Sequence, residues 1–180
     1  MSGQLHIIVG CMYSGKSTEL LKIIKNYRIL EKKILCINHS IDTRYGTNHI
    51  ISHDKNTEEC TQIDKLININ NSTDYKNCEI LVIEEAQFFE DLYDFVINAV
   101  YKDNKIIYIA GLDGDYKKEL FGDIYKLIPH CDTIKKLSAL CIICKDGTPG
   151  NFTKRIVDDN NQKLIGSIES YIPVCRKHHV

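Results

Sequence analysis

A glycine-rich segment near the N-terminus carries residue types that bind phosphate. It follows the pattern G-x-x-x-x-G-K-[ST] and consists of Gly10, Cys11, Met12, Tyr13, Ser14, Gly15, Lys16 and Ser17. Glycines let the backbone curl so that successive N–H groups point at phosphate oxygens. In this pattern the lysine reaches the β- and γ-phosphates, and the serine hydroxyl binds Mg²⁺. The segment therefore predicts a nucleoside-triphosphate site.

A pair of acidic residues forms the second chemical signal. Glu84 and Glu85 directly follow the apolar run Ile80–Ile83, which is typical of a buried strand. Phosphoryl transfer needs one carboxylate that orients Mg²⁺ and a second that accepts the proton of the attacking hydroxyl. If the strand stays extended, the two side chains leave on opposite faces, which suits separate roles. Glu84 is the candidate for magnesium, together with Ser17.

Two ligand pairs near the C-terminus indicate a metal site. Cys141-x-x-Cys144 and Cys175-x-x-His178 supply three sulfurs and one nitrogen. This set is typical of a closed, tetrahedral structural Zn²⁺ site without a catalytic position. His179 is an alternative fourth ligand, although the spacing favours His178. The other cysteines, which we interpret as small core residues, are Cys11, Cys36, Cys60, Cys78 and Cys131.

The elements that must position these residues alternate along the chain. Apolar runs at Leu5–Val9, Ile34–Ile37, Ile80–Ile83 and Ile106–Ala110 predict strands buried on both faces. Helical periodicity follows the glycine-rich segment from about Lys16, recurs through Leu92–Val100, and appears a third time around Glu119–Ile128, ending at Pro129. The pattern predicts an α/β fold with a parallel sheet flanked by helices. The long polar connection between Asn38 and Glu79 is either a functional loop or a solvated one.

The character of the sequence changes after about Ser138, where the sheet pattern ends and the first cysteine pair appears. We expect a nucleotide-binding domain over residues 1–138 and a small, ribbon-like zinc-binding domain over residues 139–180. The formal net charge of −1 argues against a nucleic-acid partner. No apolar run approaches the ~20 residues of a membrane span, and the N-terminus lacks a basic region before an apolar one. The expected location is the cytoplasm.

Taken together, the motifs resemble the type II thymidine kinases. The resemblance rests on Gly10–Ser17 followed by Thr18-Glu19-Leu20, on Asp42-Thr43-Arg44, and on Glu84-Glu85-Ala86-Gln87-Phe88-Phe89. It continues in the same order through Leu112-Asp113-Gly114, Phe121-Gly122, Thr153-Lys154-Arg155 and Cys175-x-x-His178, and so covers nearly the whole chain. The chain carries Glu84 where this family usually has aspartate.

The resemblance implies transfer of the γ-phosphoryl group of ATP, with Mg²⁺, to the 5′-hydroxyl of thymidine, giving dTMP and ADP. Glu85 would be the catalytic base, and Arg44 and Lys16 would contact the transferring phosphoryl group. A loop clipped by zinc would cover the nucleoside. The residues expected around the nucleoside are Phe88, Leu112, Phe121, Thr153, Leu164, Ile165, Gly166 and Tyr171. The resemblance also implies a homotetramer and feedback inhibition by dTTP.

Several alternatives stay open from the residues alone. Core packing competes with thymidine binding as the role of Phe88 and Phe121. A regulatory GTPase should show an Asn-Lys-x-Asp motif, which the sequence lacks, and a nucleic-acid-binding zinc module should be more basic than this C-terminal region. A kinase for deoxycytidine or a purine nucleoside is not distinguished by the motifs.

Overall fold

The computed structural model describes residues 2–42, 49–51, 57–158, 161–162 and 169–179. A six-stranded parallel sheet forms its centre, in the order β5-β2-β6-β7-β1-β8. The strands are β1 (Gln4–Gly10), β2 (Ile34–His39), β5 (Thr61–Ile63), β6 (Ile80–Ile83), β7 (Ile106–Gly111) and β8 (Thr133–Leu137). The predicted α/β fold with a helix-flanked parallel sheet is thus confirmed.

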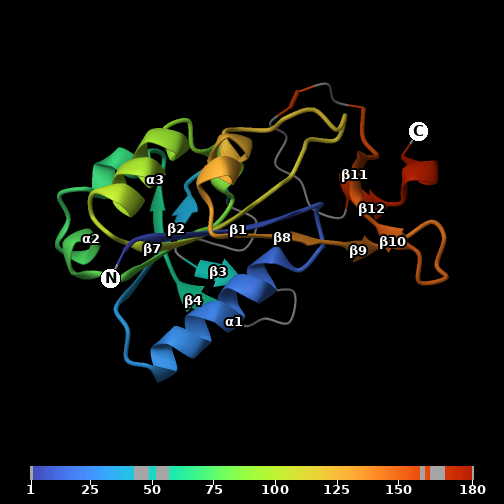
Figure 1. Cartoon of the computed structure of the whole chain (residues 1–180). Coiled ribbons are helices and arrows are strands. Elements are labelled where there is room, and N and C mark those ends of the chain that lie inside the picture. Colours follow the sequence, from blue (N-terminus) through green and yellow to red (C-terminus); the bar gives the residue numbers. More distant parts are fainter. Residues whose placement is uncertain (1, 43–48, 52–56, 159–160, 163–168, 180) are drawn as a thin grey trace.

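Helices cover both faces of this sheet (Figure 1). Helix α1 (Lys16–Ile29) packs on one face, where Leu20 and Ile24 join Ile8, Val82 and other buried residues. The opposite face carries α3 (Leu92–Tyr101), the short α2 (Thr73–Asn77), and the 3₁₀ helices η1 (Leu66–Ile69) and η3 (Ile124–His130). Because the central strands are largely buried on both faces, their sequences are mainly apolar and lack regular polar alternation.

Two strands of the sheet were missed by the sequence prediction. β8 lies at one edge and is mostly exposed, and its sequence includes Lys135 and Lys136, so it shows no apolar run. β5 lies at the other edge and spans only three residues. It belongs to the long polar connection, which also contains an antiparallel pair, β3 (His49–Ile51) with β4 (Thr57–Glu59).

The helix predicted around Glu119–Ile128 is wrong in both its start and its end. The Asp115 carboxylate accepts hydrogen bonds from the backbone N–H groups of Lys117 (2.8 Å) and Glu119 (2.9 Å) and so holds this stretch in a loop. Gly122 then adopts a left-handed φ of 64°. Only after it does a 3₁₀ helix form, over Ile124–His130, and this helix contains Pro129.

The C-terminal region consists of small antiparallel pairs that follow β8. β9 (Ala139–Leu140) pairs with β10 (Pro149–Gly150), and β11 (Phe152–Arg155) pairs with β12 (Tyr171–Val174) before the 3₁₀ helix η4 (Arg176–His178). These strands lie to one side of the main sheet (Figure 1). Within the described part of the chain, no helix is long and apolar enough to span a bilayer.

Candidate active site and metal centre

The glycine-rich loop joins β1 to α1 at the carboxyl edge of the sheet. Gly10 ends β1, and a Cβ there would lie 2.5 Å from the carbonyl oxygen of Leu137. Gly15 precedes the first turn of α1 with a left-handed φ of 85°, which favours glycine. The Ser14 hydroxyl is buried, and no hydrogen-bond partner for it occurs among the described residues. A buried hydroxyl in a loop of backbone amides fits a site for ligand oxygens.

Lys16 lies over this loop at the start of α1. Its Nζ donates to the carbonyl oxygens of Cys11 (2.8 Å) and Gly10 (3.2 Å). Burial lowers the pKa of Lys16, while the nearby carboxylates of Glu85 and Glu84 act in the opposite direction. A buried ammonium beside two carboxylates is an environment typical of functional sites.

Glu84 lies just beyond the end of β6 and is brought to the loop as the sequence predicts. Its side chain is buried, and the Ser17 hydroxyl donates a hydrogen bond to its Oε1. The backbone N–H of Glu84 donates to the carbonyl of Ile37 (2.9 Å), which ties this point of the chain to β2. A hydroxyl and a carboxylate side by side supply the hard oxygen ligands that Mg²⁺ prefers, so the residues present fit this ion.

Glu85 does not continue the strand. β6 ends at Ile83, and Glu85 adopts a left-handed conformation with φ 51° and ψ 38°. This turn, and not the pleat of an extended strand, therefore separates the two carboxylates. A left-handed conformation is uncommon for a glutamate and is found more often at functional sites. The Glu85 carboxylate accepts a hydrogen bond from Gln87 Nε2 at 2.5 Å.

Asp113 is a third carboxylate near Lys16, to which the sequence analysis gave no role. It follows β7, its Oδ2 lies 2.6 Å from Lys136 Nζ, and its charge acts on Lys16. The signal was available, because acidic residues that follow neighbouring parallel strands meet at the same edge of the sheet.

Five of the eight residues expected around a nucleoside are among the described residues: Phe88, Leu112, Phe121, Thr153 and Tyr171. Phe88 and Phe121 pack edge to face with ring centroids 5.4 Å apart; Phe121 is buried and Phe88 is half-buried. The Leu112 backbone N–H is bonded to Gln87, and the Tyr171 hydroxyl accepts a hydrogen bond from Arg155. Arg44, Leu164, Ile165 and Gly166 lie outside the described residues.

Thr153 joins the C-terminal region to the glycine-rich loop. Its buried hydroxyl accepts a hydrogen bond from the backbone N–H of Met12 at 3.0 Å. A second hydrogen bond also connects the glycine-rich loop to the C-terminal region: the Cys11 thiol donates to the carbonyl oxygen of Gly150 at 3.0 Å. Sequence reasoning assigned Thr153 only to the nucleoside and did not foresee these contacts.

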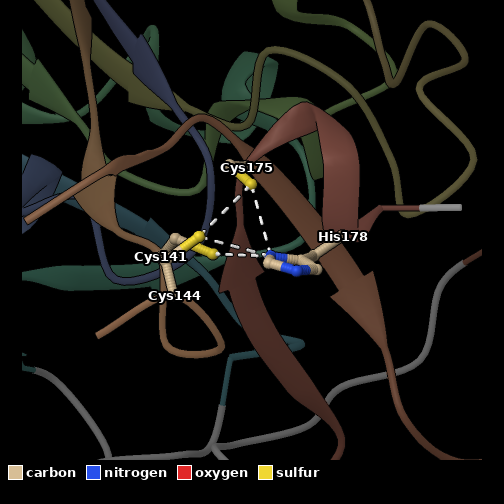
Figure 2. Close-up of side chains that lie close together, drawn as sticks. All are labelled: Cys141, Cys144, Cys175 and His178. Atoms are coloured by element: carbon tan, nitrogen blue, oxygen red, sulfur yellow. Dashed lines mark hydrogen bonds between the residues drawn. The ribbon is translucent and has the colours of Figure 1, made fainter. Parts of the chain in front are cut away.

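The predicted metal ligands converge from both ends of the C-terminal region (Figure 2). The ligand atoms of Cys141, Cys144, Cys175 and His178 all lie within 4.8 Å of one another. Cys144 Sγ lies 3.8 Å from Cys175 Sγ, and His178 Nδ1 lies 3.4–3.6 Å from the three sulfurs. An ideal tetrahedral Zn²⁺ site has edges of about 3.8 Å between sulfurs and about 3.5 Å between sulfur and nitrogen. The cluster therefore fits zinc.

The close approach of the ligands shifts two of their pKa values in opposite directions. Burial raises the pKa of the Cys141 thiol, but backbone hydrogen bonds from Cys144 and Cys175 and the His178 side chain outweigh it and lower this pKa to about 5. Burial and the neighbouring Cys141 and Cys175 side chains raise the pKa of Cys144 to about 11. The thiolate is the form that binds metal. His179, the alternative ligand, points elsewhere: its Nε2 lies 3.2 Å from the carbonyl oxygen of Thr153. The structure thus selects His178.

The fold and the site together define an α/β protein with a glycine-rich loop, acidic residues at the adjoining strand ends and a Cys₃His cluster. The profile of the family described as thymidine kinase matches residues 3–179. The chain is 40% identical to "Thymidine kinase" of Sheeppox virus (strain KS-1), an alignment that covers 97% of this chain and 96% of the viral protein. It is 38% identical to "Thymidine kinase a" of Arabidopsis thaliana, over 99% of this chain and 76% of the plant protein. It is 36% identical to "Thymidine kinase" of Vaccinia virus (strain Ankara), over 99% of this chain and 97% of that protein.

These matches span almost the entire chain. The chain belongs to the thymidine kinase family and is a phosphotransferase. The resemblance inferred from the motifs is confirmed.

Proposed function

We propose that this protein phosphorylates thymidine at its 5′-hydroxyl with ATP, giving dTMP and ADP. The observation that carries the proposal is the meeting of three groups at one edge of the sheet. These are the Lys16 ammonium, the Ser17 hydroxyl on Glu84, and the Glu85 carboxylate. They supply the parts of a phosphoryl-transfer site: positive charge, metal ligands and a base.

The glycine-rich loop is the proposed ATP site. Backbone N–H groups of residues 10–17 and the positive end of α1 would hold the phosphates. The Ser14 hydroxyl, buried without a partner among the described residues, supports a ligand in this loop. Ser17 and Glu84 would hold Mg²⁺, which neutralises charge on the phosphate oxygens. The additional methylene of Glu84, compared with the family's aspartate, is compatible with its contact to Ser17.

Glu85 is the proposed general base for the thymidine hydroxyl, and Arg44 is proposed to stabilise charge on the transferring group. Phe88, Leu112, Phe121, Thr153 and Tyr171, with the return segment Leu164–Gly166, are proposed around the nucleoside. The Phe88 ring is partly exposed and the Phe121 ring is buried, so a direct contact with the nucleoside is favoured for Phe88 over Phe121.

The metal cluster is proposed to be structural. Its four ligands leave no coordination position for a substrate. Because the ligands come from both ends of the C-terminal region, a bound ion would hold together the two ends of the loop between them. We further propose two domains, residues 1–138 and 139–180, a homotetramer, inhibition by dTTP and a cytoplasmic location. These rest on the family resemblance and on the sequence.

The test is steady-state kinetics of the purified protein with a panel of nucleosides, ATP and Mg²⁺. We expect thymidine to be used with the highest kcat/KM; equal use of deoxycytidine would defeat the assignment to thymidine. Glu85→Gln keeps the size of the side chain but cannot accept the proton, so kcat should fall about 10²–10⁴-fold. ATP binding should be retained, and Glu31→Gln, an exposed position after α1, serves as the matched control. Near-normal kcat in Glu85→Gln would show that Glu85 is not the base.

A further inference from the structure

Gln87 is a buried side chain beside the proposed base, with no role in the site described so far. Its amide makes two hydrogen bonds of opposite sense. Nε2 donates to Glu85 Oε2 at 2.5 Å, and Oε1 accepts from the backbone N–H of Leu112 at 3.1 Å. The side chain is only 2% exposed, so water does not compete freely for either bond.

The orientation of the Gln87 amide follows from its partners. A backbone N–H can only donate, so the atom that faces Leu112 must be the amide oxygen. The NH₂ group must then face Glu85 and donate to it. Because the Leu112 N–H fixes the amide from the other side, Gln87 holds Glu85 Oε2 in one direction and so sets the orientation of the carboxylate.

The space around Gln87 is fitted to this one side chain. A Cβ on Gly111 would lie 2.6 Å from Gln87 Oε1, and a Cβ on Gly122 would lie 2.3 Å from the Gln87 carbonyl oxygen. Gly122 also has a left-handed φ of 64°. The end of β7 and the loop before η3 thus hold Gln87 from two sides, and neither can carry a side chain without moving it.

We infer that Gln87 is a positioning residue that holds the Glu85 carboxylate in the orientation that proton transfer requires. It acts through Glu85 and does not touch the reacting atoms. It also connects the base to Leu112, one of the residues proposed around the nucleoside. This inference rests on the proposed function, because it requires Glu85 to be the base.

The first test compares Gln87→Met, which keeps the length of the side chain but loses both hydrogen bonds, with wild type. A hydrogen bond to a charged group contributes about 1.5–3 kcal/mol, so kcat should fall about 10–150-fold. The KM for thymidine and the affinity for ATP should change less than about 3-fold, because the loop and the aromatic pair are untouched. Gln4→Met makes the same substitution at the start of β1, at the end away from the glycine-rich loop, and is the control for the substitution itself.

Gln87→Glu is the second variant, because a methionine in this polar position is the change more able to disturb folding. It keeps the acceptor for Leu112 but places a second carboxyl group against Glu85, so activity at neutral pH should again fall. Wild-type kcat in either folded variant would overturn the inference.

A double-mutant cycle separates the two proposals. If Gln87 acts through Glu85, Gln87→Met should cost little further kcat in the Glu85→Gln background. Fully multiplicative losses would overturn the role of Gln87 while leaving Glu85 as the base. A near-normal kcat in Glu85→Gln alone would instead overturn the base assignment, and with it the reason for the inference.

Discussion

The two parts of this molecule bury very different amounts of apolar side chain. The α/β part has a buried apolar core on both faces of its sheet, with Leu5, Ile37, Leu81 and Val82 completely buried. From residue 139 onward, the buried apolar side chains among the described residues are Cys141, Tyr171, Pro173 and Val174. Thr153 and Arg155 are buried polar residues of the same region. A region with so little apolar burial needs another source of stability.

The metal cluster is the proposed source. Its paired ligands stand 31 positions apart in the chain, measured from Cys144 to Cys175, so one ion would close most of the C-terminal region. Structural zinc sites contribute folding free energy directly. The sheet thus positions the proposed catalytic residues by apolar burial, whereas we propose that metal coordination orders the C-terminal region. The two then meet at Met12 and Thr153.

Loss of the metal is the change with the largest expected effect. Cys175→Ser should abolish tight zinc binding, which in structural sites provides about 10–16 kcal/mol. Hydrogen exchange should then rise throughout the described residues beyond 138, while β1, β6 and β7 keep their protection. Zinc content is measured by elemental analysis. His178→Ala should behave like Cys175→Ser, and His179→Gln is the matched control that should retain zinc. If metal-free protein kept its protection from hydrogen exchange throughout the C-terminal region, metal coordination would not be what orders this region.

A cavity in the core of the sheet should lower the stability of the α/β part and leave zinc binding unchanged. Leu81 lies in the middle of β6 and is fully buried, so Leu81→Ala should lower the free energy of unfolding by about 2–5 kcal/mol. Zinc content should stay at one ion per chain, because the ligands are elsewhere. Chemical denaturation measures the loss. Leu140→Ala, which is 66% exposed, is the control and should change stability by less than about 0.5 kcal/mol. Similar losses in both variants would contradict the burial argument.

The hydrogen bond between Thr153 and Met12 connects the two regions, and we expect it to couple the C-terminal region to ATP binding. Thr153→Val keeps the shape of the side chain but leaves the Met12 N–H without its acceptor, at a cost of about 1–3 kcal/mol. ATP binding, measured by calorimetry, should weaken about 5–150-fold while zinc stays bound. Thr153→Ser restores the hydroxyl and should recover most of the affinity. Unchanged ATP binding in Thr153→Val would show that the contact is only a packing feature.

The smallest effect is expected for a surface ion pair of the α/β part. Lys135 of β8 lies 2.8 Å from Glu19 of α1 and holds the pKa of Glu19 below its ordinary 4.5. A lowered folded-state pKa contributes stability above 4.5 that is lost as the pH falls through the folded-state pKa. Glu19→Gln should therefore cost about 0.2–1 kcal/mol at pH 7 and nothing at a pH low enough to protonate Glu19. A larger loss, measured by urea unfolding at both pH values, would mean that charge contributes more to this part than its apolar core suggests.

The sequence by itself determined the features that depend on local pattern. Four of the strands are mainly apolar and lack regular polar alternation because they are largely buried on both faces, and the glycine-rich loop is a contiguous motif. The metal ligands were equally visible, because tetrahedral coordination by short paired segments restricts both residue type and spacing. Glu84 and Glu85 were recognised because strand and acidic pair are adjacent in the chain.

Only the tertiary structure decided the features that depend on distant partners. The exposed edge strand β8 exists because β1 supplies its hydrogen bonds, and not because its own residues are apolar. The helix expected from Glu119 is absent because the Asp115 carboxylate accepts the hydrogen bond of the Glu119 backbone N–H. The choice of His178 over its neighbour depends on side-chain direction, and the role of Gln87 depends on Leu112, 25 positions away. Local periodicity cannot encode such contacts, because hydrogen bonds between separate elements are set by how the elements pack, and that packing is decided by the whole chain.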